Sequence, residues 1–147
     1  MPPEGRAREV ALDWLRHARS NLALARQPKP AEALWEDLAF EAQQAVERAI
    51  KAVLVFHQVD FPRTHDIGEL LTLLAGARMA FPESVPRADR LTDYATGARY
   101  PGHPDPVTEA ECREAVELAE RFVRWAEGLI REPQSRQRAA DGDVGLG

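Results

Sequence analysis

Two short segments of the chain combine side chains that could carry acid–base or phosphate chemistry. The first is Arg63-Thr64-His65-Asp66, which precedes apolar residues at helical spacing. The positive end of a helix dipole disfavours protonation of His65, so its neutral ring could act as a base or donate an N–H to an anion. The structural alternative is that His65 and Asp66 only cap the helix and pack against the preceding one.

The second segment is Arg99-Tyr100-Pro101-Gly102-His103, in a proline-rich loop. An arginine guanidinium matches phosphate, and the Tyr100 ring could stack on a base. A metal-independent ribonuclease could use His103 to activate a 2′-hydroxyl and Arg99 to stabilise the charge on the phosphorane. The structural alternative is a loop that closes a helical bundle, with Arg99 paired to a carboxylate.

A third candidate lies on the longest predicted helix, over 30–59. Glu47 and Lys51 are spaced i, i+4 in the order that favours an ion pair. They lie on the helix face opposite the apolar stripe. This opposite face carries Phe40, Gln43, Gln44, Glu47, Lys51, Leu54 and Gln58. One interpretation is a solvated face with a stabilising ion pair. The other is a dimer contact or a ligand groove, because apolar residues flank the polar ones.

Other chemistries lack their motifs. The glycine-rich phosphate loops G-x-x-x-x-G-K-[ST] and G-x-G-x-x-G are absent, and so is the G-x-S-x-G nucleophile motif. The four histidines show no paired metal-ligand spacing, and Cys112 is the only cysteine. We therefore expect no metal and no cofactor, and we expect Cys112 to be a small core residue.

The elements that must position these side chains are helices. Alanine is abundant and β-branched residues are scarce in the 147-residue chain, which favours helix over strand. Apolar spacing predicts helices over 6–27, 30–59, 64–74, 84–98 and 108–132. We expect Thr64 and Ser84 to cap two of them, and Thr108 with Glu111 to form a capping box. The predicted core stripe of the second helix is Leu34, Leu38, Ala42, Ala45, Ala49, Val53 and Phe56.

The predicted fold is an all-α, up-and-down bundle of about five helices with a four-helix-bundle core. Residues 1–132 form the domain, and we expect 133–147 to be a disordered tail. The net charge of −5 gives no general attraction to nucleic acid or to an anionic membrane, although Lys51, Arg63 and Arg99 could still form a local basic cleft. The sequence contains neither a signal peptide nor an apolar run long enough to span a bilayer, so we expect a cytoplasmic protein.

Three segments together resemble the HEPN domain family. QQAVERAIKAVLV (residues 43–55) is similar to the family's QQAxEKxLKAxL helix, RTHDIGELL (63–71) to its THDLxxLL segment, and ARYPG (98–102) to its ARYP segment. The resemblance implies an all-α bundle that forms a homodimer, associates with nucleotide or RNA, and acts beside a minimal nucleotidyltransferase partner, as in toxin–antitoxin pairs. It also makes Gln43, Glu47, Lys51, Arg63, His65, Asp66, Arg99 and Tyr100 candidates for a groove or for a network that defines the fold.

Some members of that family are metal-independent ribonucleases in which about four to six residues separate an arginine from a histidine. Arg99 and His103 are closer together than that spacing, and Arg48 and His57 are further apart. The leading hypothesis is therefore a binding module that acts with a nucleotidyltransferase. A ribonuclease toxin that uses Arg99 and His103 is the alternative, and a purely structural or interaction bundle is a third possibility.

Overall fold

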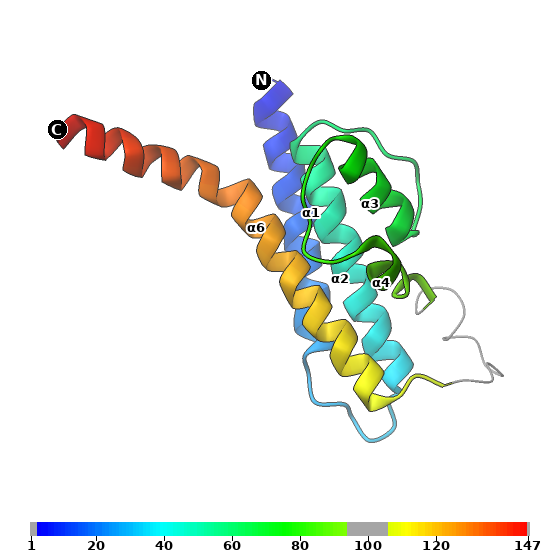
Figure 1. Ribbon diagram of the computed structural model, residues 1–147. Coiled ribbons are helices and arrows are strands. Elements are labelled where there is room, and N and C mark those ends of the chain that lie inside the picture. Colours follow the sequence, from blue (N-terminus) through cyan, green and yellow to red (C-terminus); the bar gives the residue numbers. More distant parts are fainter. Residues whose placement is uncertain (1–2, 94–105, 147) are drawn as a thin grey trace.

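Three long helices form the body of the molecule. The computed structural model describes residues 3–93 and 106–146, with side chains over 5–93 and 106–130. This part contains α1 (Pro3–Ala25), α2 (Trp35–Phe56), α3 (Ile67–Gly76), α4 (Val85–Asp89) and α6 (Glu109–Leu146), and no strand. α2 packs against α1, α3 and α6, and α1 also contacts α6 (Figure 1). The predicted all-α helical bundle is confirmed.

α2 is the central helix of the bundle. Its five alanines are fully buried: Ala39, Ala42, Ala45, Ala49 and Ala52. Because their side chains are small, α1 and α6 can approach the backbone of α2 closely. The prediction that Leu34 is a core position is wrong, because this residue is the N-cap and is 58% exposed. The two prolines in the segment 28–34 delay the start of α2 to Trp35.

The interpretation of the opposite face of α2 as a solvated face is wrong for its central residues, although Gln58 beyond the helix is exposed. Gln43 is 0%, Glu47 2% and Lys51 6% exposed, although all three are polar or charged. Side chains of α1 and of the segment 57–66 contact this face, so the same chain covers it. α2 therefore has no free polar face and is buried on several sides.

The start of α3 is held by several side chains. The N-cap is Asp66, whose carboxylate accepts a hydrogen bond from Glu69 N at 3.1 Å, and not Thr64 as predicted. Thr64 instead accepts a hydrogen bond from the backbone N–H of Asp66. Asp66 lies nearer the helix than Thr64, so its short side chain reaches the free amides of the first turn better. The N-cap is therefore Asp66 rather than Thr64.

α4 ends at Asp89, and the helix predicted over 84–98 is interrupted by a turn at residues 90–91. The chain is helical again at residues 92–93, and 94–98 lie outside the described residues. Ser84 occupies its N-cap position without a side-chain capping bond, and Leu91 is buried as expected. The predicted inward positions Tyr94 and Ala95 lie outside the described residues. The capping box of α6 is confirmed: Glu111 N donates to Thr108 Oγ1, and Thr108 N donates to Glu111 Oε1, both at 3.1 Å.

α6 continues to Leu146, which differs from the predicted disordered tail after residue 132. Gln, Arg and Ala are common between 134 and 140 and favour helix over irregular structure. The last described core residue is Ile130, and the C-terminal part of α6 projects away from the other helices (Figure 1). The domain boundary at residue 132 stays a prediction.

Candidate functional site

Glu47 is the centre of a buried polar cluster beneath the segment 57–66. Its carboxylate accepts hydrogen bonds from Gln43 Nε2 at 3.2 Å and from Lys51 Nζ at 2.9 Å. His65 Nδ1 lies 3.0 Å from Glu47 Oε1 and 3.2 Å from Oε2. A buried carboxylate is tolerated when it is paired and fully hydrogen-bonded, and these three donors meet that condition. We call Gln43, Glu47, Lys51 and His65 the Glu47 cluster.

Lys51 lies in an aromatic niche. Its ammonium group is 5.5 Å from the centroid of the Trp14 ring and 5.8 Å from that of Phe61, and these two rings meet edge to face. Cation–π attraction adds to the ion pair with Glu47. Because Lys51 is buried and paired within this niche, it does not contribute to a basic cleft at the surface, contrary to the predicted possibility.

His65 is the one member of the Glu47 cluster that reaches solvent. Its side chain is 70% exposed, whereas that of Glu47 is 3% exposed. A carboxylate at Nδ1 favours the tautomer with the proton on Nδ1, which leaves Nε2 as the outward-facing nitrogen. In the neutral ring Nε2 can accept a proton, and in the protonated ring it can donate a hydrogen bond to an anion.

Two glutamines tie the cluster to the backbone around it. Gln44 Nε2 donates to Gln43 Oε1 at 2.8 Å, and Gln43 Nε2 also lies 3.5 Å from the carbonyl oxygen of His65. The chain Gln44–Gln43–Glu47 therefore runs along α2 and ends at His65. This arrangement fixes the imidazole ring relative to α2 through both its side chain and its main chain.

The other predicted site residues are placed differently. Asp66 caps α3, and Arg63 is exposed and does not join the Glu47 cluster. Arg99, Tyr100 and His103 lie outside the described residues. Within the part that is described, no group of three or more His, Cys, Asp or Glu side chains could hold a metal ion.

Sequence reasoning misses two members of this neighbourhood, Trp14 and Phe61. The spacing of Trp14 places it on the apolar stripe of the first helix, and nothing in that spacing connects it to Lys51, which lies on another helix. Phe61 falls in a segment without periodicity, between Asp60 and Pro62. The only signal in the sequence is that both are large aromatic residues near polar ones.

The fold and the sequence agree on one family. The model of the HEPN domain matches residues 11–129, which covers most of the chain. The chain therefore belongs to the HEPN family, as the three sequence segments predict. The crystal structure of an archaeal HEPN homologue is similar, with 27% sequence identity and a TM-score of 0.63, over 82% of this chain and 98% of that one.

Two further findings are negative. Among curated proteins, none matches the chain. Over the residues that the structure describes, no helix has both the length and the apolar character needed to cross a bilayer.

Proposed function

We propose that this HEPN protein is a cytoplasmic binding module that contacts nucleotide or RNA phosphate and acts, as a homodimer, with a minimal nucleotidyltransferase. Family membership supports the general class, since the resemblance implies nucleotide or RNA association and such a partner. The observation that carries the proposal is His65, an exposed imidazole whose Nδ1 is held by the buried Glu47. A toxin–antitoxin role is part of the same proposal.

The geometry of His65 suits a phosphate contact. The ring is fixed by Glu47, so less conformational entropy is lost when Nε2 binds a ligand than for an untethered side chain. Once protonated, the ring donates a charge-assisted hydrogen bond to a phosphate oxygen. Arg63, two residues earlier, is exposed and supplies a second positive charge in the same segment.

The net charge predicts a particular kind of binding. A chain with a formal charge of −5 gains little from general counterion release, so RNA affinity should come from few contacts. For single-stranded RNA the slope of log K against log salt is about −0.7 for each phosphate contact. We expect a shallow salt dependence, with a slope of about −1 rather than the steep slope of a basic RNA-binding protein.

The test is a titration of the full chain with a short single-stranded RNA, followed by the ¹⁵N and ¹H shifts of the histidine rings. We expect the ring signals of His65 to move, and the free protein to have His65 protonated on Nδ1 when the ring is neutral. His65→Asn keeps a donor near Glu47 but removes Nε2, and should weaken binding roughly tenfold. His17→Asn is the matched control, because His17 is also exposed but lies on α1.

A second experiment addresses the partner. Co-expression with the minimal nucleotidyltransferase of the same genome should yield a stable complex on size exclusion, in which the HEPN chain is dimeric. If the protein binds neither RNA nor the nucleotidyltransferase, the proposal is wrong and the structural-bundle hypothesis is favoured.

The ribonuclease hypothesis is a distinct alternative. The Glu47–His65 pair supports the ribonuclease hypothesis, because a carboxylate that orients an imidazole is a common arrangement for a general base. Cleavage of RNA in EDTA by the wild-type protein, and its loss in Arg99→Ala and His103→Ala, would favour this alternative with His103 as the base. Loss in His65→Asn alone would assign the base to His65.

A further inference from the structure

A groove along α6 combines apolar side chains with arginines and includes no member of the Glu47 cluster. One wall is α6, and the other is the segment 79–82 that follows α3. Its volume is about 740 Å³, within the range of small-molecule sites. We call it the Trp125 groove.

The floor of the Trp125 groove is apolar and only partly covered by the chain itself. Its large side chains are half-buried against the core: Met79, Phe81, Trp125 and Leu129. Apolar side chains that gather at one place without full cover mark a binding surface, whereas single exposed ones do not. Residues 121, 125 and 129 follow one another along one face of α6, which rises about 12 Å from 121 to 129. The groove is therefore long enough for the apolar body of a medium-length organic molecule.

The two walls of the groove are held together. Trp125 Nε1 donates to the carbonyl oxygen of Ala80 at 3.0 Å, and the Trp125 ring meets that of Phe122 edge to face. At the start of the segment 79–82, Met79 N donates to the carbonyl oxygen of Leu74 at 3.0 Å. Walls that are already fixed lose little conformational entropy on binding, which favours affinity for a small molecule.

The charges that line the Trp125 groove are of one sign. Arg121 and Arg124 line it, and no aspartate or glutamate does among the residues that the structure describes. His57 also lines it, and partial burial lowers the pKa of this imidazole, so the ring carries no charge at neutral pH. An apolar body joined to one negative group therefore matches the groove.

Arg124 is the arginine that is more easily released to a ligand. Its guanidinium lies 3.6 Å from the carboxylate of Glu120, and that carboxylate is closer to Arg26, at 3.1 Å. The Arg124 side chain is 74% exposed, so solvent screens this pair. Arg121 instead pairs with Glu83 at 3.3 Å, and the Glu83 side chain is only 14% exposed. Arg124 can therefore exchange Glu120 for a ligand at little cost, because Arg26 still pairs with Glu120.

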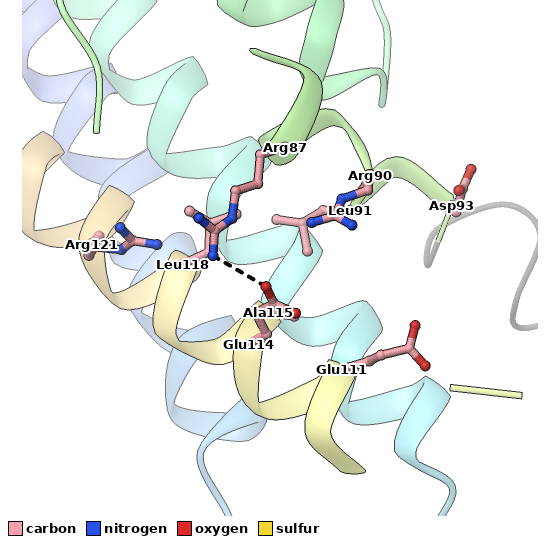
Figure 2. A pocket seen from close by; sticks show the side chains of 9 residues that line it. All are labelled: Arg87, Arg90, Leu91, Asp93, Glu111, Glu114, Ala115, Leu118 and Arg121. Carbon is pink, nitrogen blue, oxygen red and sulfur yellow. Dashed lines mark hydrogen bonds and ion pairs between the residues drawn. The ribbon is translucent and has the colours of Figure 1, made fainter. Parts of the chain in front are cut away.

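A neighbouring hollow between α4 and α6 shares Arg121 but has a mixed lining. Its charged residues are three arginines and three carboxylates: Arg87, Arg90, Arg121, Asp93, Glu111 and Glu114. Figure 2 shows Arg87 paired with Glu114, while Asp93 and Glu111 lie at the other end of this hollow. Charges of both signs select no anion there. The lining of one sign is therefore particular to the Trp125 groove.

We propose that the Trp125 groove binds a small amphipathic carboxylic acid, with its apolar body on the indole of Trp125 and its carboxylate on Arg124. A guanidinium and a carboxylate form paired, charge-assisted hydrogen bonds. The apolar body supplies most of the affinity, because it covers apolar surface that the chain leaves partly exposed to water. The site shares no residue with the proposed phosphate contact at His65 and goes beyond the proposed function.

The test is binding of octanoate to the full chain, measured by calorimetry below the micelle concentration. Octylammonium has a similar apolar body with a positive charge, and acetate has the carboxylate without that body. We expect octanoate to bind about tenfold more tightly than either, or better. The net charge of −5 attracts the cation in general, so a preference for octanoate must come from the groove. Equal affinity for octanoate and octylammonium would overturn the proposal.

Arg124→Gln tests the contact with the carboxylate. It should weaken octanoate binding about tenfold and should not weaken octylammonium binding. Arg113→Gln is the matched control, because Arg113 is also 74% exposed and also pairs with a glutamate four residues earlier on α6. Arg113 does not line the groove. The proposal is wrong if the two variants bind octanoate equally well.

Fluorescence and a blocking substitution locate the apolar body. Trp125→Phe should abolish the change in tryptophan fluorescence on octanoate binding, whereas Trp35→Phe should retain it. Ala80→Phe adds a ring to a residue that lines the groove and should abolish binding, while Ala77→Phe, at the exposed C-cap of α3, should not. Melting temperatures identify any variant that fails to fold, and Arg124→Gln decides if Ala80→Phe is one. A fluorescence change that survives in Trp125→Phe, or octanoate that binds folded Ala80→Phe normally, would contradict the site.

Two outcomes separate this inference from other possibilities. His65→Asn should leave octanoate binding unchanged, so failure of the RNA titration and failure of octanoate binding count against different proposals. If octanoate does not bind and Ala80→Phe instead converts a dimer into a monomer, a second copy of the chain covers the groove and the proposal is wrong.

Discussion

At the scale of single residues, the Glu47 cluster has a more stringent requirement than an ordinary ion pair. Glu47 and Lys51 are both buried, so each loses its contacts with water. Their ion pair and hydrogen bonds to neighbouring side chains must replace those contacts. Gln43 and His65 supply the remaining hydrogen bonds of the carboxylate, and two aromatic rings face the ammonium group. The result is a charge pair whose members depend on each other, with an exposed imidazole attached.

This dependence predicts a non-additive pair of substitutions. Glu47→Gln leaves the Lys51 ammonium buried without a counter-charge and should lower the free energy of unfolding by about 3–5 kcal/mol. Adding Lys51→Met to Glu47→Gln should restore much of that loss, because methionine fits an apolar niche. Urea denaturation of the two single variants and the double variant measures the coupling.

The matched control is an exposed pair with the same i, i+4 spacing, Glu109 and Arg113 on α6. Glu109→Gln should change the free energy of unfolding by no more than about 0.5 kcal/mol, since solvent screens such pairs. A double variant at Glu47 and Lys51 that is as unstable as the sum of the single variants would contradict the mutual dependence.

His57, at the C-cap of α2, gives a pH-dependent prediction. Partial burial lowers the pKa of His57 below its ordinary value of 6.5, so folding favours the neutral ring. The contribution of neutral His57 to the free energy of unfolding is complete above pH 6.5. It is lost as the pH falls through the lower pKa of the folded state, because the unfolded chain binds the proton more readily. His57→Gln should therefore show a smaller drop in the urea midpoint between about pH 7 and pH 5 than the wild type. An equal drop in both proteins would exclude His57 as a source of the acid sensitivity.

At the scale of elements, the start of α3 depends on α4. Gly68 N donates to Asp89 Oδ1 at 2.8 Å, and Ile67 N donates to Thr92 Oγ1 at 3.2 Å. Asp89 also accepts a hydrogen bond from Thr92. Together with Asp66, these side chains satisfy amides that the helix itself leaves unpaired. The segment after α4 is thereby fastened to the helix that follows His65.

This contact requires glycine at position 68. A Cβ atom there would lie 2.7 Å from Asp89 Cγ, and moving Asp89 away would break its bonds to Gly68 and Thr92. Gly68→Ala should lower the free energy of unfolding by about 1–3 kcal/mol. Gly76→Ala is the matched control in the same helix, because a Cβ atom at position 76 would have no neighbour within 4 Å.

Thermal unfolding of the two alanine variants makes the comparison. Gly76→Ala should be as stable as the wild type or up to about 1 kcal/mol more stable, since alanine favours helix. If Gly68→Ala behaves like Gly76→Ala, Asp89 does not hold the start of α3 as tightly as its distances indicate.

The elements also show what the sequence can and cannot predict. Apolar spacing locates the long helices, and the pattern of Thr108 and Glu111 predicts the cap of α6, because both are local signals. The burial of Glu47 and Lys51 is not predictable from their charges, which ordinarily indicate exposure. Only the tertiary contact with His65, eighteen residues after Glu47, brings the candidate site together.

At the scale of the whole molecule, the helices differ in how much of each contributes to the core. α2 is buried along most of its length, whereas the last described core residue of α6 is Ile130. A helix segment without an apolar partner gains little from packing and depends on its intrinsic propensity. The part of α6 that projects from the bundle is therefore expected to contribute little to the stability of the fold (Figure 1).

Two truncations test where the folded domain ends. A chain that stops after residue 132 should unfold within about 2 °C of the full chain, because it retains Ala126 and Ile130, both fully buried. A chain that stops after residue 125 loses both side chains. Removing a buried isoleucine costs about 2–5 kcal/mol, so this shorter chain should melt far lower or fail to fold. Similar large losses in both truncations would mean that residues 133–146 pack on the bundle, and that the predicted domain boundary at residue 132 is wrong.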